Sequence, residues 1–503
     1  MKCVKRPIVI VVGLDGASWY LLYDWIISGC LPTFREIMRN GVYSNLVSTL
    51  PMMTCPAWKS LTSGLTPRQI GAYGFVIPDF KSKKCTFVDS TLLKGKDIWT
   101  YLSKRGFKVC VINVPWSYPP SKVNGVFIAG FPCTDDQDYT YPPSIKKLLT
   151  NIGYSIDLLR VASIVNKSQL SLKEYIHQIN LKFSIARTAI RLNYDFIFLV
   201  IFYIDKISHF LWNDEITLTI FRSIDSELNS LLSELEKRGR PFALFVVSDH
   251  GMYPTSLGFE LNTWLYKEGY LKLSDDVISR KISIKTLRKS FLITQVRNAL
   301  TQLSIVSDIL HLMLVNLSKK KLIGPLLKHV LTTSFDGRLS DVDLIKYIDL
   351  NKTKAMALQQ CIYVLENDPG KYNTLAREIA SKLEKLRDPV FNKKVVKKCI
   401  IVESRAPFKR PAILIEPEKG VNITNKLSFS KQPFKIISKR HGMWIANHIR
   451  NGVFIAYGNI IKKLGKLPEV DIKDITPTVL HIFGISKSYM VKGKVLDVIL
   501  DLK

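Results

Sequence analysis

Short, uninterrupted apolar runs alternate with stretches of helical spacing through the first half of the chain. The apolar runs lie at residues 8–14, 108–114, 196–203 and 242–247. Strands that are apolar at every position are buried on both faces, which is typical of a parallel sheet covered by helices. Helical spacing lies between these runs, for example at residues 95–105 and 216–237. The pattern predicts an α/β fold with a mainly parallel central sheet between two layers of helices.

The alternation stops near residue 271 and gives way to long helical periodicity with many lysines. The segment RKISIKTLRKSFLITQVR holds six basic residues and no acidic one. Strand-like runs return later, at residues 399–403, 412–415 and 452–457. We therefore predict an α/β core in two parts, residues 1–270 and 341–503. Residues 271–340 are expected to form a helical, basic insertion (a cap) whose charged side is solvated.

The formal net charge of +30 at pH 7 is unusual for a chain of 503 residues. A basic balance favours nucleic acid or an anionic membrane surface as a partner. The lysines are scattered, however, and are rarely interleaved with aromatic residues as a base-stacking platform requires. A solvated basic surface that helps to recruit a small anionic substrate is therefore the favoured interpretation.

The eight cysteines are widely spread, and none forms a Cys-x-x-Cys pair. Neither a zinc ribbon nor a dithiol redox site is indicated, and a reduced, cytoplasmic setting is expected. No stretch reaches the roughly 18 uninterrupted apolar residues that a membrane span requires. The nearest candidate, residues 304–317, is interrupted by Asp308 and His311.

Three of the predicted strands end in residues that can bind a metal. Asp15 follows the first run, Asp205 follows the third with His209 four residues later, and Asp249-His250 follows the fourth. Taken singly, such an aspartate is more often a helix N-cap, and such a histidine more often a hydrogen-bonded structural residue. Sites in open α/β sheets form at the carboxyl ends of strands, so together these residues indicate a dinuclear metal site with nitrogen and oxygen ligands.

Three common motifs of nucleotide-binding proteins and hydrolases are absent from the sequence. GLDGAS does not satisfy G-x-G-x-x-G, because Asp15 stands at the position of the second glycine. The chain contains neither G-x-x-x-x-G-K-[ST] nor the G-x-S-x-G elbow.

A hydrolase with a dinuclear metal site needs a nucleophile, and one hydroxyl-rich segment, STLPMMTCPAWKSLTSG, offers several. Its candidate hydroxyls are Thr54, Ser60, Thr62 and Ser63. Thr54 precedes Cys55-Pro56, a turn that can open a helix with the hydroxyl facing a metal, and an alcohol bound to a dication ionises far more easily. The alternative is that Thr54 is only an N-cap. Cys55 is a rival nucleophile, although a thiolate beside zinc tends to become a ligand.

Seven motifs together resemble the alkaline phosphatase superfamily. The resemblance is to the branch of type I phosphodiesterases, nucleotide pyrophosphatases and predicted prokaryotic phosphohydrolases or phosphomutases. The motifs are VVGLDGASW, TCPAWKSLTSG, VINVPWSYPPSKVNG, FYIDKISHFLW, VVSDHGM, HIRNGVFIAYG and DITPTVLHIFGI. They span most of the chain, and the resemblance implies the three-layer α/β/α sandwich of alkaline phosphatase.

The resemblance implies two divalent metal ions, with Zn²⁺ expected and Mn²⁺ or iron as alternatives. One ion would be held by Asp15, Thr54, Asp249 and His250. The other would be held by Asp205, His209 and a histidine late in the chain. The family pattern places that histidine four residues before the glycine that opens the last core strand, which favours His448 over His441. The implied mechanism is in-line attack of Thr54 on phosphorus, followed by hydrolysis of the phosphothreonine.

The chain departs from nucleotide pyrophosphatases in two positions. Those enzymes carry an asparagine about twenty residues after the nucleophile, but this chain reads GAYGF there, with Phe75 nearest to the position of that asparagine. Ile70 stands where those enzymes usually carry a histidine. The family's nucleotide preference therefore does not transfer directly. Phe75 becomes a candidate substrate-binding residue that could stack on a base or an apolar leaving group.

The leading hypothesis is a metal-dependent hydrolase of phosphoric esters, either diesters or monoesters. Within the superfamily, a phosphoglycerate mutase would use a serine nucleophile, and a sulfatase would use a modified Cys or Ser in a C-x-P-x-R-like motif, so Thr54 fits neither. A third hypothesis is a basic protein that binds nucleic acid or a membrane surface and carries a vestigial metal site.

Overall fold

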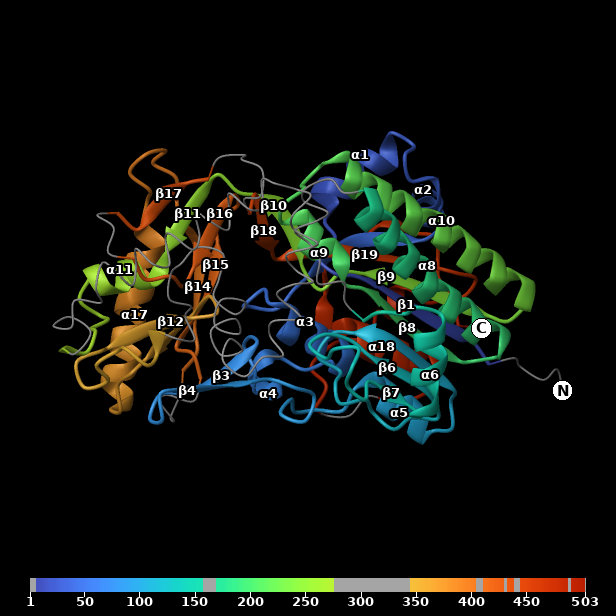
Figure 1. The fold of residues 1–503 in the computed structure, drawn as a ribbon. Coiled ribbons are helices and arrows are strands. Elements are labelled where there is room, and N and C mark those ends of the chain that lie inside the picture. The colour runs from blue at the N-terminus through green and yellow to red at the C-terminus, as the bar shows by residue number, and fades with distance from the viewer. Residues whose placement is uncertain are drawn as a thin grey trace. The chain divides into compact units, whose positions relative to one another are not determined.

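The chain forms two compact units in the computed structural model (Figure 1). The structure describes residues 6–156, 169–275, 344–403, 410–428, 432–437, 444–486 and 490–502. The first unit comprises Met1–Ile77, Phe87–Ser256 and Ile437–Lys503, and the second comprises Pro78–Thr86 and Leu257–Ile436. Almost all of the predicted insertion, residues 271–340, and the apolar stretch 304–317 lie outside the described residues. The predicted domain boundaries therefore stay predictions.

A ten-stranded sheet forms the centre of the first unit among the residues described. Its strands are β1 (Ile8–Leu14), β2 (Val42–Val47), β5 (Val109–Val114), β6 (Gly125–Ala129), β7 (Thr140–Tyr141), β8 (Phe196–Ile201), β9 (Phe242–Val247), β19 (Asn451–Tyr457), β20 (Gly465–Lys466) and β21 (Val470–Asp471). The order is β20-β2-β19-β9-β1-β8-β5-β6-β7, and β21 pairs with β2. From β9 to β6 all neighbouring strands are parallel, whereas β19 and β7 pair antiparallel with their neighbours.

Helices cover both faces of this sheet. In Figure 1, α1 (Trp19–Ile27), α2 (Pro32–Asn40), α8 (Gln169–Arg191) and α10 (Glu215–Arg238) lie above it, and α5 (Ile98–Lys104), α6 (Ser144–Asn151) and α18 (Ile475–Ile482) lie below it. The strands β1, β5, β8 and β9 are buried at every position, because helices cover them from both sides. The prediction of a mainly parallel α/β sandwich is confirmed.

Shorter elements complete the first unit. They are α3 (Thr54–Ser63), α4 (Pro67–Ile70), α9 (Tyr203–Ser208), the antiparallel pair β10 (Gly251–Pro254) and β18 (Ala446–Ile449), and the short helices η1 (Ile472–Asp474) and η2 (Asp497–Ile499). The hairpin of β3 (Val76–Asp79) and β4 (Lys84–Phe87) carries the chain into the second unit and back.

Besides the β3–β4 hairpin, the described residues of the second unit form two small sheets. One pairs β11 (Leu257–Glu260) with β16 (Val421–Thr424) and β17 (Phe434–Ile436), and the other contains β12 (Ala355–Leu358), β13 (Cys361–Val364), β14 (Val396–Ile401) and β15 (Ile413–Pro417). The helices α11 (Leu261–Lys267) and α17 (Pro369–Lys385) accompany them. Of the three late strand-like runs, only residues 452–457 rejoin the central sheet. Residues 399–401 and 413–415 lie in β14 and β15, which pair antiparallel with each other.

A helix that spans a membrane must be both long enough and apolar enough to cross the bilayer. No helix among the described residues meets both requirements.

Candidate metal centre

The predicted metal ligands lie at one edge of the central sheet. β1 pairs in parallel with both β8 and β9, so the three strands end side by side. Asp15 follows β1, Asp205 lies in α9 just after β8, and Asp249-His250 follows β9. β10 begins directly after His250 and pairs with β18, which brings His448 opposite Met252. Parallel order in the sheet therefore gathers residues that are far apart in sequence.

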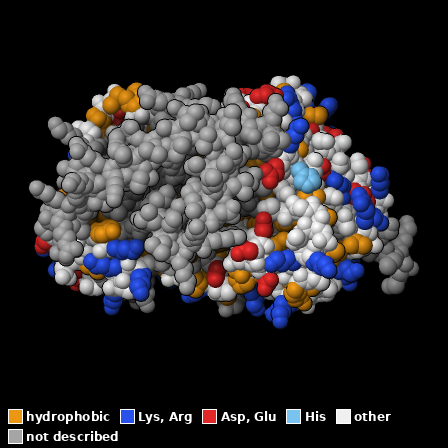
Figure 2. Space-filling model, in the orientation of Figure 1, with side chains coloured by type: hydrophobic (Ala, Val, Ile, Leu, Met, Phe, Trp, Pro, Cys, Tyr) orange, Lys and Arg blue, Asp and Glu red, His pale blue; other side chains and the backbone are white. Residues whose placement is uncertain are grey.

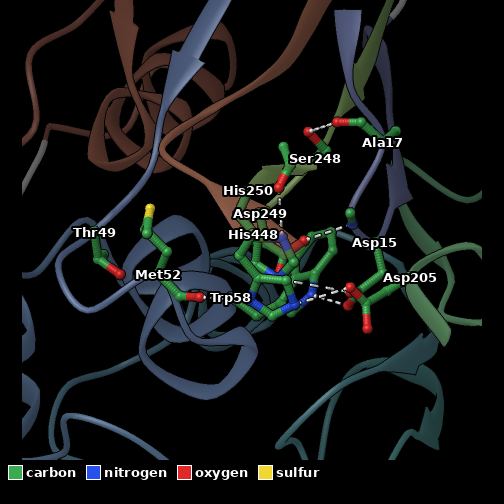
Figure 3. Close-up of polar contacts among 12 residues, drawn as sticks. Asp15, Ala17, Thr49, Met52, Trp58, Asp205, Ser248, Asp249, His250 and His448 are labelled. Atoms are coloured by element: carbon green, nitrogen blue, oxygen red, sulfur yellow. Dashed lines mark hydrogen bonds and ion pairs between the residues drawn. The ribbon is translucent and has the colours of Figure 1, made fainter. Parts of the chain in front are cut away.

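Asp205, His209 and His448 form the first group of ligand atoms. His448 Nε2 lies 3.1 Å from Asp205 Oδ1 and 3.3 Å from His209 Nε2 (Figure 3). The Nδ1 atoms of both rings face away from this group. His209 Nδ1 lies 2.7 Å from the Ala446 carbonyl oxygen, and His448 Nδ1 lies 2.8 Å from the Met52 carbonyl oxygen. A carbonyl oxygen only accepts, so each ring carries its proton on Nδ1 and turns the Nε2 lone pair toward the group. This is the arrangement of a metal-binding histidine oriented by a backbone acceptor.

Asp15, Asp249 and His250 form the second group, and all three are fully buried. His250 Nε2 lies 3.2 Å from Asp249 Oδ2 and 4.0 Å from Asp15 Oδ1. These three atoms have no hydrogen-bond partner. Ligand atoms of Asp15, Asp205 and His250 also lie within 4.8 Å of one another, so Asp205 belongs to both groups. Buried polar atoms without partners are costly, and a cation between them would satisfy all three.

Burial and the negative charges of neighbouring carboxylates shift the pKa values of Asp15 and Asp249. Burial, and then the negative charges of Asp249 and Asp205, raises the pKa of Asp15 well above its ordinary value. Burial and Asp205 raise the pKa of Asp249 to about 8. Burial alone would raise the pKa of Asp205 too, but His209 and His448 outweigh it and hold that pKa well below its ordinary value. Buried carboxylates that repel one another when ionised favour a bound cation, because its positive charge offsets their negative charges.

The surroundings of the site lower the pKa of His250 but raise the pKa of His448. Burial, and then the nearby His448, lowers the pKa of His250 well below its ordinary value, so this imidazole is neutral and able to bind a metal. Burial also acts to lower the pKa of His448, but the charge and hydrogen bond of Asp205 outweigh it and raise that pKa.

Trp58 fixes the orientation of Asp15. Its indole Nε1–H donates to Asp15 Oδ2 at 2.7 Å, which leaves Oδ1 facing His250. Gly13 makes room for this ring, because a Cβ atom there would lie 2.4 Å from the Trp58 ring. Gly16 has a φ of +68°, and its N–H donates to Asp249 Oδ1 at 3.2 Å. Both glycines of the first motif are thus required by contacts that the metal centre makes.

Replacing Trp58 with phenylalanine is expected to weaken the metal centre. The variant keeps an aromatic ring but leaves Asp15 Oδ2 without its donor, so the free energy of unfolding should fall by about 1–3 kcal/mol. Metal affinity should fall about 10–100-fold, as is common when a group that orients a ligand is lost. Urea denaturation and metal titration measure the two effects.

Trp99→Phe is the matched control for Trp58→Phe. Trp99 is equally buried in the same hydrophobic core, and its indole N–H has no hydrogen-bond partner. The Trp99→Phe variant should lose only packing contacts, and its metal affinity should equal that of the wild type. Equal loss of metal affinity in both variants would contradict the role given to the Trp58 N–H.

Thr54 is the first residue of α3 and is buried. The N-cap position belongs to Met53, whose backbone is extended, so the alternative that Thr54 is the N-cap is wrong. The segment around Thr54 is tied to both groups of ligands, because the Met52 carbonyl binds His448 and Trp58 binds Asp15.

The rival nucleophiles on α3 are less suited. Burial raises the pKa of the Cys55 thiol well above its ordinary value, which disfavours the thiolate. Thr62 donates its hydroxyl to Asp97 at 2.6 Å, and Ser63 donates to the Lys59 carbonyl at 2.5 Å. The Ser60 hydroxyl is buried without a partner.

The profile of the family described as type I phosphodiesterase / nucleotide pyrophosphatase matches residues 9–444, which is most of the chain. The protein belongs to this family. The predicted resemblance is confirmed, and membership places this type I phosphodiesterase relative among the phosphoester hydrolases. No curated protein sequence matches it.

Two solved structures share the fold of this phosphodiesterase family member. Phosphonoacetate hydrolase from Sinorhizobium meliloti 1021, in complex with phosphonoformate, matches with a TM-score of 0.58 and 14% identity over 94% of each chain. Human ectonucleotide pyrophosphatase / phosphodiesterase 5 matches with a TM-score of 0.52 and 14% identity over 98% of each chain. At these identities the likeness concerns the fold.

The structure brings most of the predicted site residues of this phosphodiesterase relative together. Asp15, Asp205, His209, Asp249, His250 and His448 form one group, in which every residue is buried except the partly buried His448. His441 lies outside the described residues. Phe75 is half-buried and stacks on Trp116, with ring centroids 4.7 Å apart, in a hydrophobic cluster that includes Cys55 beside Thr54. Its role in binding substrate, like the metal-binding roles, stays a prediction.

Sequence reasoning missed Trp58 and the Met52 carbonyl as supports of the ligands. A signal for Trp58 exists, since it stands four residues after Thr54 and therefore on the same face of one helix. Nothing in the sequence marks the Met52 carbonyl.

Proposed function

We propose that this phosphodiesterase family member hydrolyses phosphoric esters with a threonine nucleophile and two bound divalent metal ions. The observation that carries the proposal is the convergence of three buried carboxylates, two buried imidazoles and the partly buried imidazole of His448, with three of their atoms lacking any hydrogen-bond partner. Carboxylate and neutral imidazole donors suit Zn²⁺ first, and also Mn²⁺ and iron. We therefore name Zn²⁺ as the expected metal.

One group of residues would hold each ion. Asp15, Asp249 and His250 would hold one ion together with Thr54, and Asp205, His209 and His448 would hold the other. Bound ions would lower the pKa of the Thr54 hydroxyl and stabilise negative charge on the phosphoryl oxygens.

The chain's own residues supply the rest of the reaction. Thr54 Oγ1 gives up its proton to solvent and forms a bond to phosphorus while the bond from phosphorus to the leaving oxygen breaks in line; the leaving oxygen takes a proton from solvent, and the leaving group departs as an alcohol. Water then attacks the phosphothreonine, which releases the phosphate or monoester and restores the Thr54 hydroxyl. The contacts of Met52 with His448 and of Trp58 with Asp15 hold the residues on either side of Thr54 against the two groups of ligands, which supports Thr54 as the nucleophile.

A panel of chromogenic esters tests this function. We expect protein stripped of metal and reloaded with Zn²⁺ or Mn²⁺ to hydrolyse bis(p-nitrophenyl) phosphate, p-nitrophenyl phosphate or both, and the stripped protein to hydrolyse neither. Failure to cleave either ester with any of these metals would contradict the proposal. The ratio of the two rates decides between diester and monoester preference.

A further inference from the structure

One loop of the second unit exposes adjoining apolar side chains. The loop, residues 387–394, joins α17 to β14, and we call it the 387–394 loop. At its centre, Val390 is 57% exposed and Phe391 is 54% exposed, and Pro389 before them is exposed as well. Single exposed apolar side chains are common on protein surfaces, but a contiguous group of them marks a place where a protein binds a partner.

The Asp388 carboxylate supports the conformation of the 387–394 loop. It accepts hydrogen bonds from the backbone N–H groups of Val390 at 3.0 Å, Phe391 at 2.7 Å and Lys393 at 2.7 Å. The two ends of the loop also pair with each other in an antiparallel bridge. Because these contacts order the loop before any partner is present, binding through Val390 and Phe391 costs little conformational entropy.

Positive charge surrounds the exposed apolar side chains. Residues 385–398 contain six basic residues, all at least partly exposed, and one acidic residue, the buried Asp388. The end of β15 and the residues after it lie against this segment and add Glu416, Glu418 and Lys419. Glu416 pairs with Lys397 at 2.7 Å, and an excess of positive charge remains. In Figure 2, Lys and Arg side chains gather on the described part of the second unit, with hydrophobic side chains beside them.

We propose that the 387–394 loop docks the protein onto an anionic lipid surface. The apolar side chains would enter the boundary between head groups and acyl chains, and the lysines and Arg387 would meet lipid phosphates. A nucleic acid offers the same negative charge, but of the apolar side chains it could stack only on Phe391. A second copy of the chain is disfavoured, because each copy carries a net charge of +30. This docking does not depend on the proposed hydrolase function.

Vesicle co-sedimentation of the full-length protein tests the docking. Vesicles of phosphatidylcholine alone are compared with vesicles that also contain phosphatidylglycerol, at low and high salt. We expect wild-type protein to bind only the anionic vesicles, and to bind them more weakly at high salt. The double variant Val390→Ser/Phe391→Ser should bind them at least about tenfold more weakly, because it removes most of the apolar contact. Its thermal denaturation should match that of the wild type, which shows that the variant folds.

Tyr23→Ser/Ile27→Ser on α1 is the matched control. These side chains are 46% and 56% exposed, but the exposed charges around them cancel, since they belong to Asp24, Arg35, Glu36 and Arg39. This variant should bind anionic vesicles within about twofold of the wild type, as expected for apolar side chains outside the docking surface.

Two results would overturn the docking proposal. One is a wild-type protein that does not bind anionic vesicles, and the other is equal binding by wild type and the Val390/Phe391 variant. If that variant bound vesicles normally but lost binding to a single-stranded oligonucleotide, the 387–394 loop would belong to a nucleic-acid site instead.

Discussion

Thr54→Ala is expected to lower the turnover of a phosphoric ester by at least about 10³-fold, because it removes the atom that forms the bond to phosphorus. The side chain is small and stands at the first position of α3, so the fold and the six other ligands should persist. Stopped-time assays with the zinc-loaded protein measure the turnover, and metal analysis measures how much metal the variant binds. Thr54→Ser, which keeps a hydroxyl, should recover part of the rate.

Ser60→Ala is the matched control for Thr54→Ala. Ser60 lies on the same helix and is buried, and its hydroxyl has no hydrogen-bond partner. Its loss should leave turnover nearly unchanged. Full turnover in Thr54→Ala, or a large loss in Ser60→Ala, would mean that the nucleophile has been misassigned.

Asp205→Ala is expected to remove metal from the whole centre. Asp205 lies within 4.8 Å of ligand atoms in both groups, whereas His209 belongs only to the first. The loss of Asp205 leaves His209 and His448 without their carboxylate partner and removes an oxygen next to Asp15 and His250. Elemental analysis should find two ions per wild-type chain and almost none in Asp205→Ala. Turnover should fall by at least about 10³-fold, since ligand and transition-state stabilisation are lost together.

His209→Ala separates the two groups of ligands. We expect this variant to retain one ion, held by Asp15, Asp249 and His250. If Asp205→Ala also retained one ion, Asp205 would serve only one of the two groups, and the shared position would be contradicted.

Where the signal is local, the sequence predicted the sheet well, and it also predicted which residues lie together at the edge of the sheet. β1, β8 and β9 are uninterrupted apolar runs, and the first acidic residue after each of them, Asp15, Asp205 and Asp249, lies at the sheet edge. His448 was harder, because it comes from β18, a strand of four residues with mixed burial. Only the family pattern marked it.

Contacts between distant segments could not be predicted from the sequence. The hydrogen bonds from Trp58 to Asp15 and from His448 to the Met52 carbonyl arise only when α3 packs against the sheet edge. The same limit applies to β14 and β15. Their apolar runs indicated strands, but not that the strands would pair with each other instead of joining the central sheet.

Activity measured during metal reconstitution is the sharpest test of a hydrolase that uses Thr54 and two bound metal ions. Wild-type protein is stripped with a chelator, and hydrolysis of bis(p-nitrophenyl) phosphate and p-nitrophenyl phosphate is followed as Zn²⁺ is added. We expect no turnover in the stripped protein and a rise in turnover that ends at two equivalents of Zn²⁺. Thr54→Ala should show no such rise although it binds the same metal. Turnover that persists without metal, or that Thr54→Ala retains, would rule out a threonine nucleophile that works with two bound ions.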